Sequence, residues 1–253
     1  MMNDETELLK KRFAELAAKS YNAGIFTFTD FLGLAEQSAF EECRSALRGI
    51  KYTAFGGAEG AERVMIRFGD VEELGYEVPF PIVTLRIAPT SQKFADKLTH
   101  RDFLGSLLNL GIERSVLGDI VIIDNVGYVF VHEDMAEYIS TSLTRIKHTD
   151  VRISIAEELP EGELYRREVR RIQISSERLD AVIAKTFSLS RDDAQALFAR
   201  GLVFVGGRCI ESVSYTPKQG DVISVRGHGR MVYRGFDSLS KKGKLNAIVE
   251  LYV

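Results

Sequence analysis

Apolar positions near the start of the chain recur at helical spacing. Four of them stand at i, i+4, i+7 and i+8: Leu9, Phe13, Leu16 and Ala17. This spacing predicts an amphipathic helix over residues 4–20, and a similar pattern predicts a second helix over 30–47. Two apolar runs then flank a glycine-rich turn, so residues 51–55 and 63–68 are predicted to pair as a β-hairpin.

The central part of the chain follows a break at Pro79 and Pro81 and alternates between two apolar patterns. Strand and helix patterns follow one another in the order β-α-β-β-α-β, at residues 82–88, 99–110, 119–124, 127–131, 133–146 and 151–155. That order is typical of a ferredoxin-like unit of the RRM type. The polar segment Pro160-Glu161-Gly162-Glu163 is predicted to be a linker.

The last third of the chain predicts two short helices and two tight turns. One helix is expected to begin within residues 176–180, and a second follows Ser190, which is a good N-cap. Gly201 stands where a C′ glycine would end the second helix. Gly206-Gly207 permits the positive φ angles of a hairpin turn, and Gly220-Asp221 predicts another turn.

Together these elements predict an α+β fold class with three domains. The predicted domains are an N-terminal α/β domain over 1–78, an RRM-like (ferredoxin-like βαββαβ) middle domain over 79–158, and a C-terminal domain with basic strands over 159–253. A chain of 253 residues has the length expected for two or three small domains.

Charge divides the chain near the start of the C-terminal domain. Residues 166–253 hold 16 Lys and Arg against 9 Asp and Glu, a net charge of +7. Residues 1–165 hold 17 against 27, a net charge of −10, although the whole chain carries only −3. Random variation among solvated faces is the plainer interpretation. Because the charge changes where the pattern changes, we favour a basic module suited to a phosphate backbone.

Basic and polar residues of this module are the candidate RNA-binding residues. Helix N-termini offer backbone N–H groups to phosphate, and arginine binds phosphate bidentately and stacks on bases. The predicted set is Arg178, Ser190, Arg191, Gln195, Arg200, Arg208, Lys218, Arg226, His228, Arg230 and Arg234, with His100 and Arg101 from the middle domain. The alternative is that the arginines form a solvated face paired with nearby acids, namely Glu177, Asp180, Asp192 and Asp193.

Other classes of site find no support in the sequence. Cys43 and Cys209 are the two cysteines, they form no Cys-x-x-Cys pair, and neither a zinc site nor a disulfide framework is expected. There is no apolar run of about 18 residues and no signal peptide, so we expect a cytoplasmic protein without a membrane partner. A P-loop motif is also missing, and no cofactor, metal or DNA partner is predicted.

The C-terminal pattern resembles the S4 RNA-binding domain. Four segments carry the resemblance: Arg178-Leu179-Asp180, Ser190-Arg191, Gly201-Leu202-Val203-Phe204-Val205 and Gly220-Asp221-Val222-Ile223. The resemblance implies a C-terminal RNA-binding domain of the αL type. Gly206 departs from the family pattern, which usually has Asn there, so any base contact from that Asn would be absent.

Nearly the whole chain is similar to the bacterial YlmH family. The matching segments are residues 56–63, 100–112, 118–120, 224–230 and 240–244. This resemblance implies a ribosome-associated, non-catalytic RNA-binding protein with rRNA of the large ribosomal subunit as its partner and tRNA as a further candidate. It also implies ribosome quality control, the rescue of stalled large subunits that carry peptidyl-tRNA, and a link to cell-division genes.

Two other functions stay open. His100-Arg101-Asp102 is similar to the surroundings of the catalytic Asp in pseudouridine synthases, many of which carry S4 domains. The predicted middle unit, at roughly 75 residues, is small for such a catalytic domain, and the helix dipole also explains an Asp at a helix start. The other alternative is a scaffold linked to cell division.

Two further segments have a structural interpretation. Tyr128 and Phe130 share one face of the third strand of the middle domain, where an RRM carries aromatics that stack on bases; we favour packing in the core. Residues 240–244 predict a basic turn before the last strand.

Overall fold

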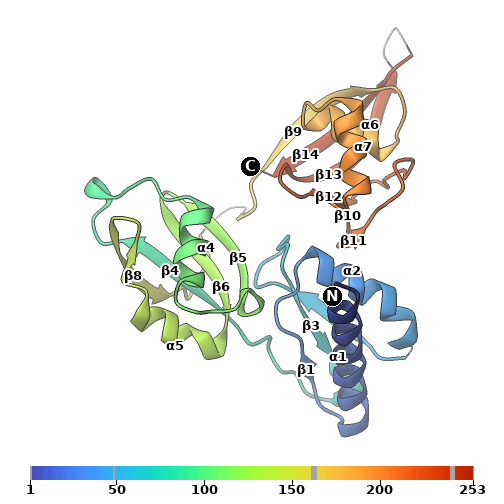
Figure 1. The fold of residues 1–253 in the computed structure, drawn as a ribbon. Helices are drawn as coiled ribbons and strands as arrows, with labels where there is room; N and C mark the ends of the chain where they lie inside the picture. The colour runs from blue at the N-terminus through green and yellow to red at the C-terminus, as the bar shows by residue number, and fades with distance from the viewer. Residues whose placement is uncertain (1, 48, 161–163, 240–242, 253) are drawn as a thin grey trace. The chain divides into compact units, whose positions relative to one another are not determined.

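The computed structural model describes residues 2–47, 49–160, 164–239 and 243–252. The predicted linker at 160–163 and the basic turn at 240–244 lie largely outside these residues. The chain divides into two compact units, Met1–Leu164 and Tyr165–Val253. Figure 1 shows the elements of each unit, and each is described separately below.

The first part of unit one is a small three-stranded sheet with helices. Its elements are α1 (Met2–Ala23), β1 (Thr27–Phe28), α2 (Leu34–Cys43), the 3-10 helix η1 (Arg44–Leu47), β2 (Tyr52–Phe55), β3 (Met65–Phe68) and α3 (Val71–Leu74). The strands lie in the order β1-β3-β2. The hairpin of β2 and β3 confirms the predicted pairing. The predicted helix over 30–47 was wrong at its start, because Leu32 pairs with Val64 before the helix begins at Leu34.

The second part of unit one confirms the ferredoxin-like prediction. It contains β4 (Ile82–Pro89), η2 (Gln92–Phe94), α4 (His100–Leu108), η3 (Arg114–Val116), β5 (Leu117–Ile123), β6 (Val126–His132), α5 (Glu133–Ser142), β7 (Arg145–Ile146) and β8 (Thr149–Ile155). The strand order is β5-β6-β4-β8-β7, and every pair is antiparallel. If the four long strands are numbered along the chain, their order across the sheet is 2-3-1-4, which is the order of a ferredoxin-like unit.

Two details of this part differ from the sequence pattern. The turn between β5 and β6 is Asp124-Asn125, and both residues have positive φ angles of 49° and 65°, as a type I′ hairpin turn demands. The predicted helix over 133–146 ends at Ser142 because Leu143 is extended. Ile146 lies in β7 and packs into the same core as the helix, which is why its spacing looked helical.

Unit two is a six-stranded sheet with two helices. Its elements are β9 (Arg167–Ile174), α6 (Leu179–Thr186), α7 (Arg191–Ala199), β10 (Val203–Val205), β11 (Arg208–Cys209), β12 (Val222–Val225), β13 (Gly229–Leu239) and β14 (Leu245–Tyr252). The strand order is β11-β10-β12-β13-β14-β9. The predicted helices, the C′ glycine Gly201 at φ 63° and the Gly206-Gly207 turn at φ 55° and 82° are confirmed. The α+β class is therefore confirmed as well.

One face of this sheet buries the core. Val182 and Ile183 of α6 and Leu197 and Phe198 of α7 pack with strand residues that include Met231, and together they form one buried cluster. In Figure 1 both helices lie together on that face of the sheet. The second face carries the alternate residues of each strand, because side chains alternate between the two faces of a sheet.

Candidate RNA interface

A buried carboxylate joins the starts of the two helices in unit two. Asp180 is fully buried, and its Oδ1 and Oδ2 accept from Nε and Nη2 of Arg178 at 3.1 and 3.0 Å. Gln195 of α7 donates to Oδ2 at 3.0 Å, and Nε of Arg191 lies 3.7 Å from the same oxygen. Three predicted RNA-binding residues therefore meet at one acid that lies between the helices.

The environment of Asp180 keeps it ionised. Burial alone raises the pKa of this carboxyl, but the hydrogen bond from Gln195 and the hydrogen bonds and charge of Arg178 outweigh burial and lower the pKa overall. A buried charge is tolerated when it is paired and hydrogen-bonded in this way. The result is that Arg178 and Gln195 are fixed, while the side chain of Arg191 is 66% exposed and can reach a ligand.

The start of α7 has the geometry predicted for a capped helix. Oγ of Ser190 accepts from the Asp193 N–H at 3.1 Å, and its hydroxyl donates to the Asp193 carboxylate at 2.6 Å. Asp193 is therefore occupied by Ser190, and Glu177 accepts the hydroxyl of Tyr233 at 2.9 Å. Of the acids that could neutralise the arginines, Asp180 does pair with arginine. Asp193 and Glu177 bind hydroxyl groups instead.

Further basic side chains of unit two stay exposed and uncompensated. Arg200 is the C-cap residue of α7, Arg208 lies in β11, and Lys218 precedes the Gly220 turn. None of these three residues makes an ion pair with any residue that the structure describes, and neither does Arg226. Arg191 and Arg200 mark opposite ends of α7, about 13 Å apart along the helix axis at 1.5 Å per residue.

The loop between β12 and β13 presents Arg226 and His228. The Arg226 guanidinium lies 5.1 Å from the ring centre of Phe204, and the His228 ring lies 6.0 Å from that of Phe187. Both side chains belong to exposed residues. The adjacent Gly229 has φ 140°, a conformation that suits glycine and lets the chain turn closely past Phe187.

Arg230 and Arg234 lie on the other face of the sheet. Met231 and Tyr233 point into the core, so their neighbours in β13 point away from α6 and α7. Arg234 donates to both oxygens of Glu250 at 2.8 Å, and Arg230 stacks over Tyr252 with 3.8 Å between its Cζ and the ring centre. The predicted residues therefore occupy two faces of the sheet instead of one surface.

His100 and Arg101 lie at the start of α4 in unit one, and both are exposed. Partial desolvation lowers the pKa of His100, with the charge of Arg114 acting in the same direction. Asp102 accepts from the backbone N–H and the hydroxyl of Thr99 at 2.8 and 2.6 Å and pairs with Lys147 at 2.7 Å. The carboxylate of Asp102 is thus engaged as a helix cap, and its hydrogen bonds from Lys147 and Thr99 lower its pKa to about 2.

Part of the RRM-like sheet face is covered within unit one. Phe130 is fully buried against Phe31 and Met65, and a Cβ added at Gly57 would lie 2.3 Å from its ring. The favoured core role of Phe130 is therefore confirmed. Its neighbour on the same face, Tyr128, is partly exposed.

Arg63 fixes this cover in place, and sequence reasoning missed it. Its guanidinium donates to the carbonyls of Leu117, Phe31 and Arg114 at 2.8, 2.8 and 3.0 Å. Asp119 accepts from the backbone N–H of Arg63 at 3.0 Å. Burial lowers the pKa of Arg63, and it lowers that of the neighbouring Arg114 to about 10. These partners are 32 to 56 residues away in the chain, so no local pattern could indicate them.

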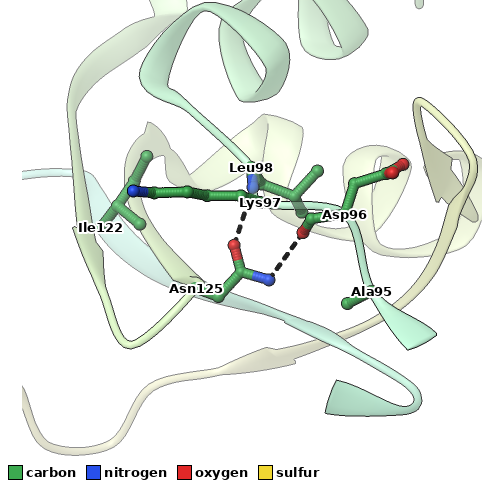
Figure 2. Close-up of a pocket in the computed structure, with 6 residues that line it drawn as sticks. All are labelled: Ala95, Asp96, Lys97, Leu98, Ile122 and Asn125. Carbon is green, nitrogen blue, oxygen red and sulfur yellow. Dashed lines mark hydrogen bonds between the residues drawn. The ribbon is translucent and has the colours of Figure 1, made fainter. Parts of the chain in front are cut away.

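A pocket in unit one is lined by residues of the β5–β6 hairpin and of the loop before α4. Figure 2 shows Asn125 at the β5–β6 turn facing the loop that leads into α4. Its side chain accepts from Leu98 N–H at 2.8 Å and donates to the Asp96 carbonyl at 2.9 Å. The amide is therefore used to hold the loop. Among the described residues there is no cluster of His, Cys, Asp or Glu able to hold a metal, and no helix that is long and apolar enough to cross a membrane.

Two family models match the chain at the positions of these sites. One is described as "Putative RNA-binding domain in YlmH" and matches residues 77–158, and the other is the S4 domain and matches residues 177–223. The chain carries a YlmH RNA-binding domain and an S4 domain. The resemblance to the YlmH family is thereby confirmed. Its S4 domain contains the Asp180 cluster, and its YlmH domain contains the RRM-like sheet.

Two individual proteins are similar over part of the chain. The "Ribosome-associated protein quality control protein P2" of Bacillus subtilis (strain 168) is 33% identical over 165 residues, which cover 62% of this chain and 63% of that protein. The match therefore spans less than two thirds of the relative. A solved structure, "Cell division protein ylmH from Streptococcus pneumoniae", matches with a TM-score of 0.47 and 20% identity over 60% of this chain and 91% of that one.

Proposed function

We propose that the chain is a non-catalytic RNA-binding protein that associates with the large ribosomal subunit in the cytoplasm. The observation that carries the proposal is the Asp180 cluster, which fixes Arg178 and Gln195 and attracts the exposed Arg191 at the start of α7, in a unit of net charge +7. Phosphate is the ligand that such a surface suits, because helix N-termini and arginine guanidinium groups both favour it. The S4 match and the ribosome-associated relative support RNA over other polyanions.

The finer part of the proposal concerns the state of the ribosome. The Bacillus subtilis relative is named as a ribosome-associated quality control protein. We extend this role to the present chain as the binding of stalled large subunits, with rRNA as the main ligand and tRNA as a second. The capped, ion-paired state of Asp102 favours a non-catalytic role over base modification, because a nucleophile must be free to reach its substrate.

Sedimentation with isolated large subunits at several salt concentrations tests the proposal. The variant Arg191→Ala/Arg200→Ala removes two exposed charges from the two ends of α7. We expect weaker binding and a salt slope that is smaller by about 0.7–0.9 for each lost phosphate contact. The control Lys11→Ala/Arg12→Ala makes the same charge change on α1, where both residues are exposed, and should bind like the wild type.

The outcome that overturns the proposal is equally specific. If the α7 double variant sediments with large subunits as the wild type does at every salt concentration, this surface is not the RNA interface. A loss of equal size in the α1 control would show that only net charge matters. Binding to small subunits alone would contradict the assignment to the large subunit.

A further inference from the structure

The sheet of unit two has a second basic surface on the face away from its helices. Arg230 and Arg234 of β13 lie on this face, and Tyr252 of β14 pairs with Arg167 of β9 beside them. Tyr165 precedes β9, and its ring lies 6.4 Å from that of Tyr252 at an angle of 73°. We call Arg230, Tyr252 and Tyr165 the back-face cluster.

The guanidinium of Arg230 is held by the two tyrosines of the cluster. Its Cζ lies 3.8 Å from the ring centre of Tyr252 and 5.2 Å from that of Tyr165. Stacking of this kind fixes the plane of a guanidinium without using its N–H groups. The side chain has therefore lost much of its rotamer freedom before any ligand arrives, which lowers the entropic cost of binding.

The N–H groups of Arg230 remain available. The guanidinium makes no hydrogen bond or ion pair with another residue that the structure describes, and its nitrogens are not among the buried atoms that lack a partner. A side chain that served only as a brace would normally pair with a carboxylate, since an arginine without an acceptor forgoes strong hydrogen bonds. The donors of Arg230 thus point to an acceptor other than the residues that the structure describes.

The carboxylate beside the cluster is engaged by arginines other than Arg230. Glu250 is the neighbouring acid, and it binds Arg234 at 2.8 Å and Arg167 at 3.2 Å. The hydrogen bonds and charge of Arg234 lower the pKa of Glu250, so the carboxylate is ionised and already occupied at neutral pH. Glu250 is therefore taken by Arg234 and Arg167, and Arg230 makes no ion pair with any residue that the structure describes.

We infer that the back-face cluster is a second RNA contact, in which Arg230 binds a backbone phosphate and Tyr165 stacks on an unpaired base. This inference rests on the proposed function and extends it. The helices and the sheet separate this cluster from the Asp180 cluster, so the two faces hold different RNA segments. Unit two then acts as a bridge between two parts of a folded RNA. RNA is favoured over an acidic protein because the cluster combines a phosphate receptor with aromatic rings, the pairing used to bind unstacked nucleotides.

The test uses the full chain and protein-free rRNA extracted from large subunits. Arg230→Gln should weaken binding about tenfold and reduce the salt slope by about 0.7–0.9, because it removes one phosphate contact. Tyr165→Leu should weaken binding about tenfold with an unchanged salt slope, because base stacking carries no charge. Arg171→Gln is the charge-matched control: it lies on β9, is 72% exposed, and is already paired with Asp237 at 2.6 Å.

Three results would overturn the inference, and they are distinct from failure of the proposed function. If Arg230→Gln binds rRNA with wild-type affinity while the α7 variant binds more weakly, the back-face cluster does not contact RNA. The proposed function would then still stand. Equal losses in Arg230→Gln and Arg171→Gln would reduce the effect to net charge. Normal binding to protein-free rRNA with lost binding to intact subunits would identify an acidic protein as the occupant. Thermal unfolding of each variant shows whether the fold is retained.

Discussion

Replacing Asp180 by Asn separates positioning from net charge in the proposed RNA interface. The change keeps the size of the side chain and an oxygen that can accept from the Ala181 N–H, but it removes the negative charge that holds Arg178 and attracts Arg191. Net charge alone would favour tighter RNA binding, because the unit gains one positive charge. Loss of positioning predicts the opposite sign.

The magnitudes follow from the contacts. Removing one partner of a buried ion pair costs about 3–5 kcal/mol of unfolding free energy. We expect about 3 kcal/mol, since the side chain of Arg178 is 35% exposed and solvent screens its charge. Each arginine that must be ordered again on binding costs about 0.5–1.5 kcal/mol, so RNA affinity should fall about fivefold. Urea unfolding and filter binding measure the two effects.

The matched control is Asp192→Asn, which makes the same charge change at an exposed residue in the first turn of α7. It should lose only a few tenths of a kcal/mol through the helix dipole, and it should bind RNA as well as the wild type or better. If Asp180→Asn also binds RNA as tightly as the wild type, Asp180 does not position the interface.

The pH dependence of stability has a definite sign at this site. The pKa of Asp180 is lower in the folded chain than its ordinary value of 3.8. Its contribution is therefore fully present above that value and is lost as pH falls through the lower, folded pKa. The stabilities of the wild type and Asp180→Asn should differ at neutral pH, and this difference should begin to shrink as the pH falls below about 3.8.

Three further predictions concern other parts of the fold. Asp102→Asn should lower the unfolding midpoint at pH 7 but not at about pH 2, where the wild-type carboxyl loses its charge. Mass spectrometry of RNA from cells with this variant should show the normal base modifications. Gly57→Ala should cost more than about 2 kcal/mol in urea unfolding because its Cβ would strike the buried ring of Phe130, whereas Gly111→Ala, also at positive φ but in open space, should cost about 1–2 kcal/mol. Gly206→Asn should change stability by less than about 0.5 kcal/mol, since Asn tolerates the turn; a larger loss would contradict the open space around it.

Local signals in the sequence were sufficient where the structure is local. The Gly206-Gly207 turn, the cap at Ser190 and the order of elements in the middle domain were all predicted and are present. The end of α5 was predicted too late, because the apolar spacing continues through Ile146 although the chain has already entered a strand. A shared core explains both the spacing and the error.

Local sequence patterns could not predict the contacts between residues that are far apart in the chain. Asp180 looked like one of several acids that neutralise arginines, and its burial between α6 and α7 shows it to be the residue that gathers them. Arg230 was predicted in one set with the helix arginines, but the alternation of β13 turns it to the opposite face, where it meets Tyr165 and Tyr252.

By itself the sequence determined the classes of element, the βαββαβ order, the basic C-terminal third and the resemblance to the YlmH family, because caps, turns, periodicity and net charge are properties of neighbouring residues. The tertiary structure alone decided which charges are free. An arginine at a helix start and one in a strand have the same chemistry in the sequence. Whether a carboxylate such as Asp180 or a ring such as that of Tyr252 lies beside it depends on packing between elements that are far apart in the chain.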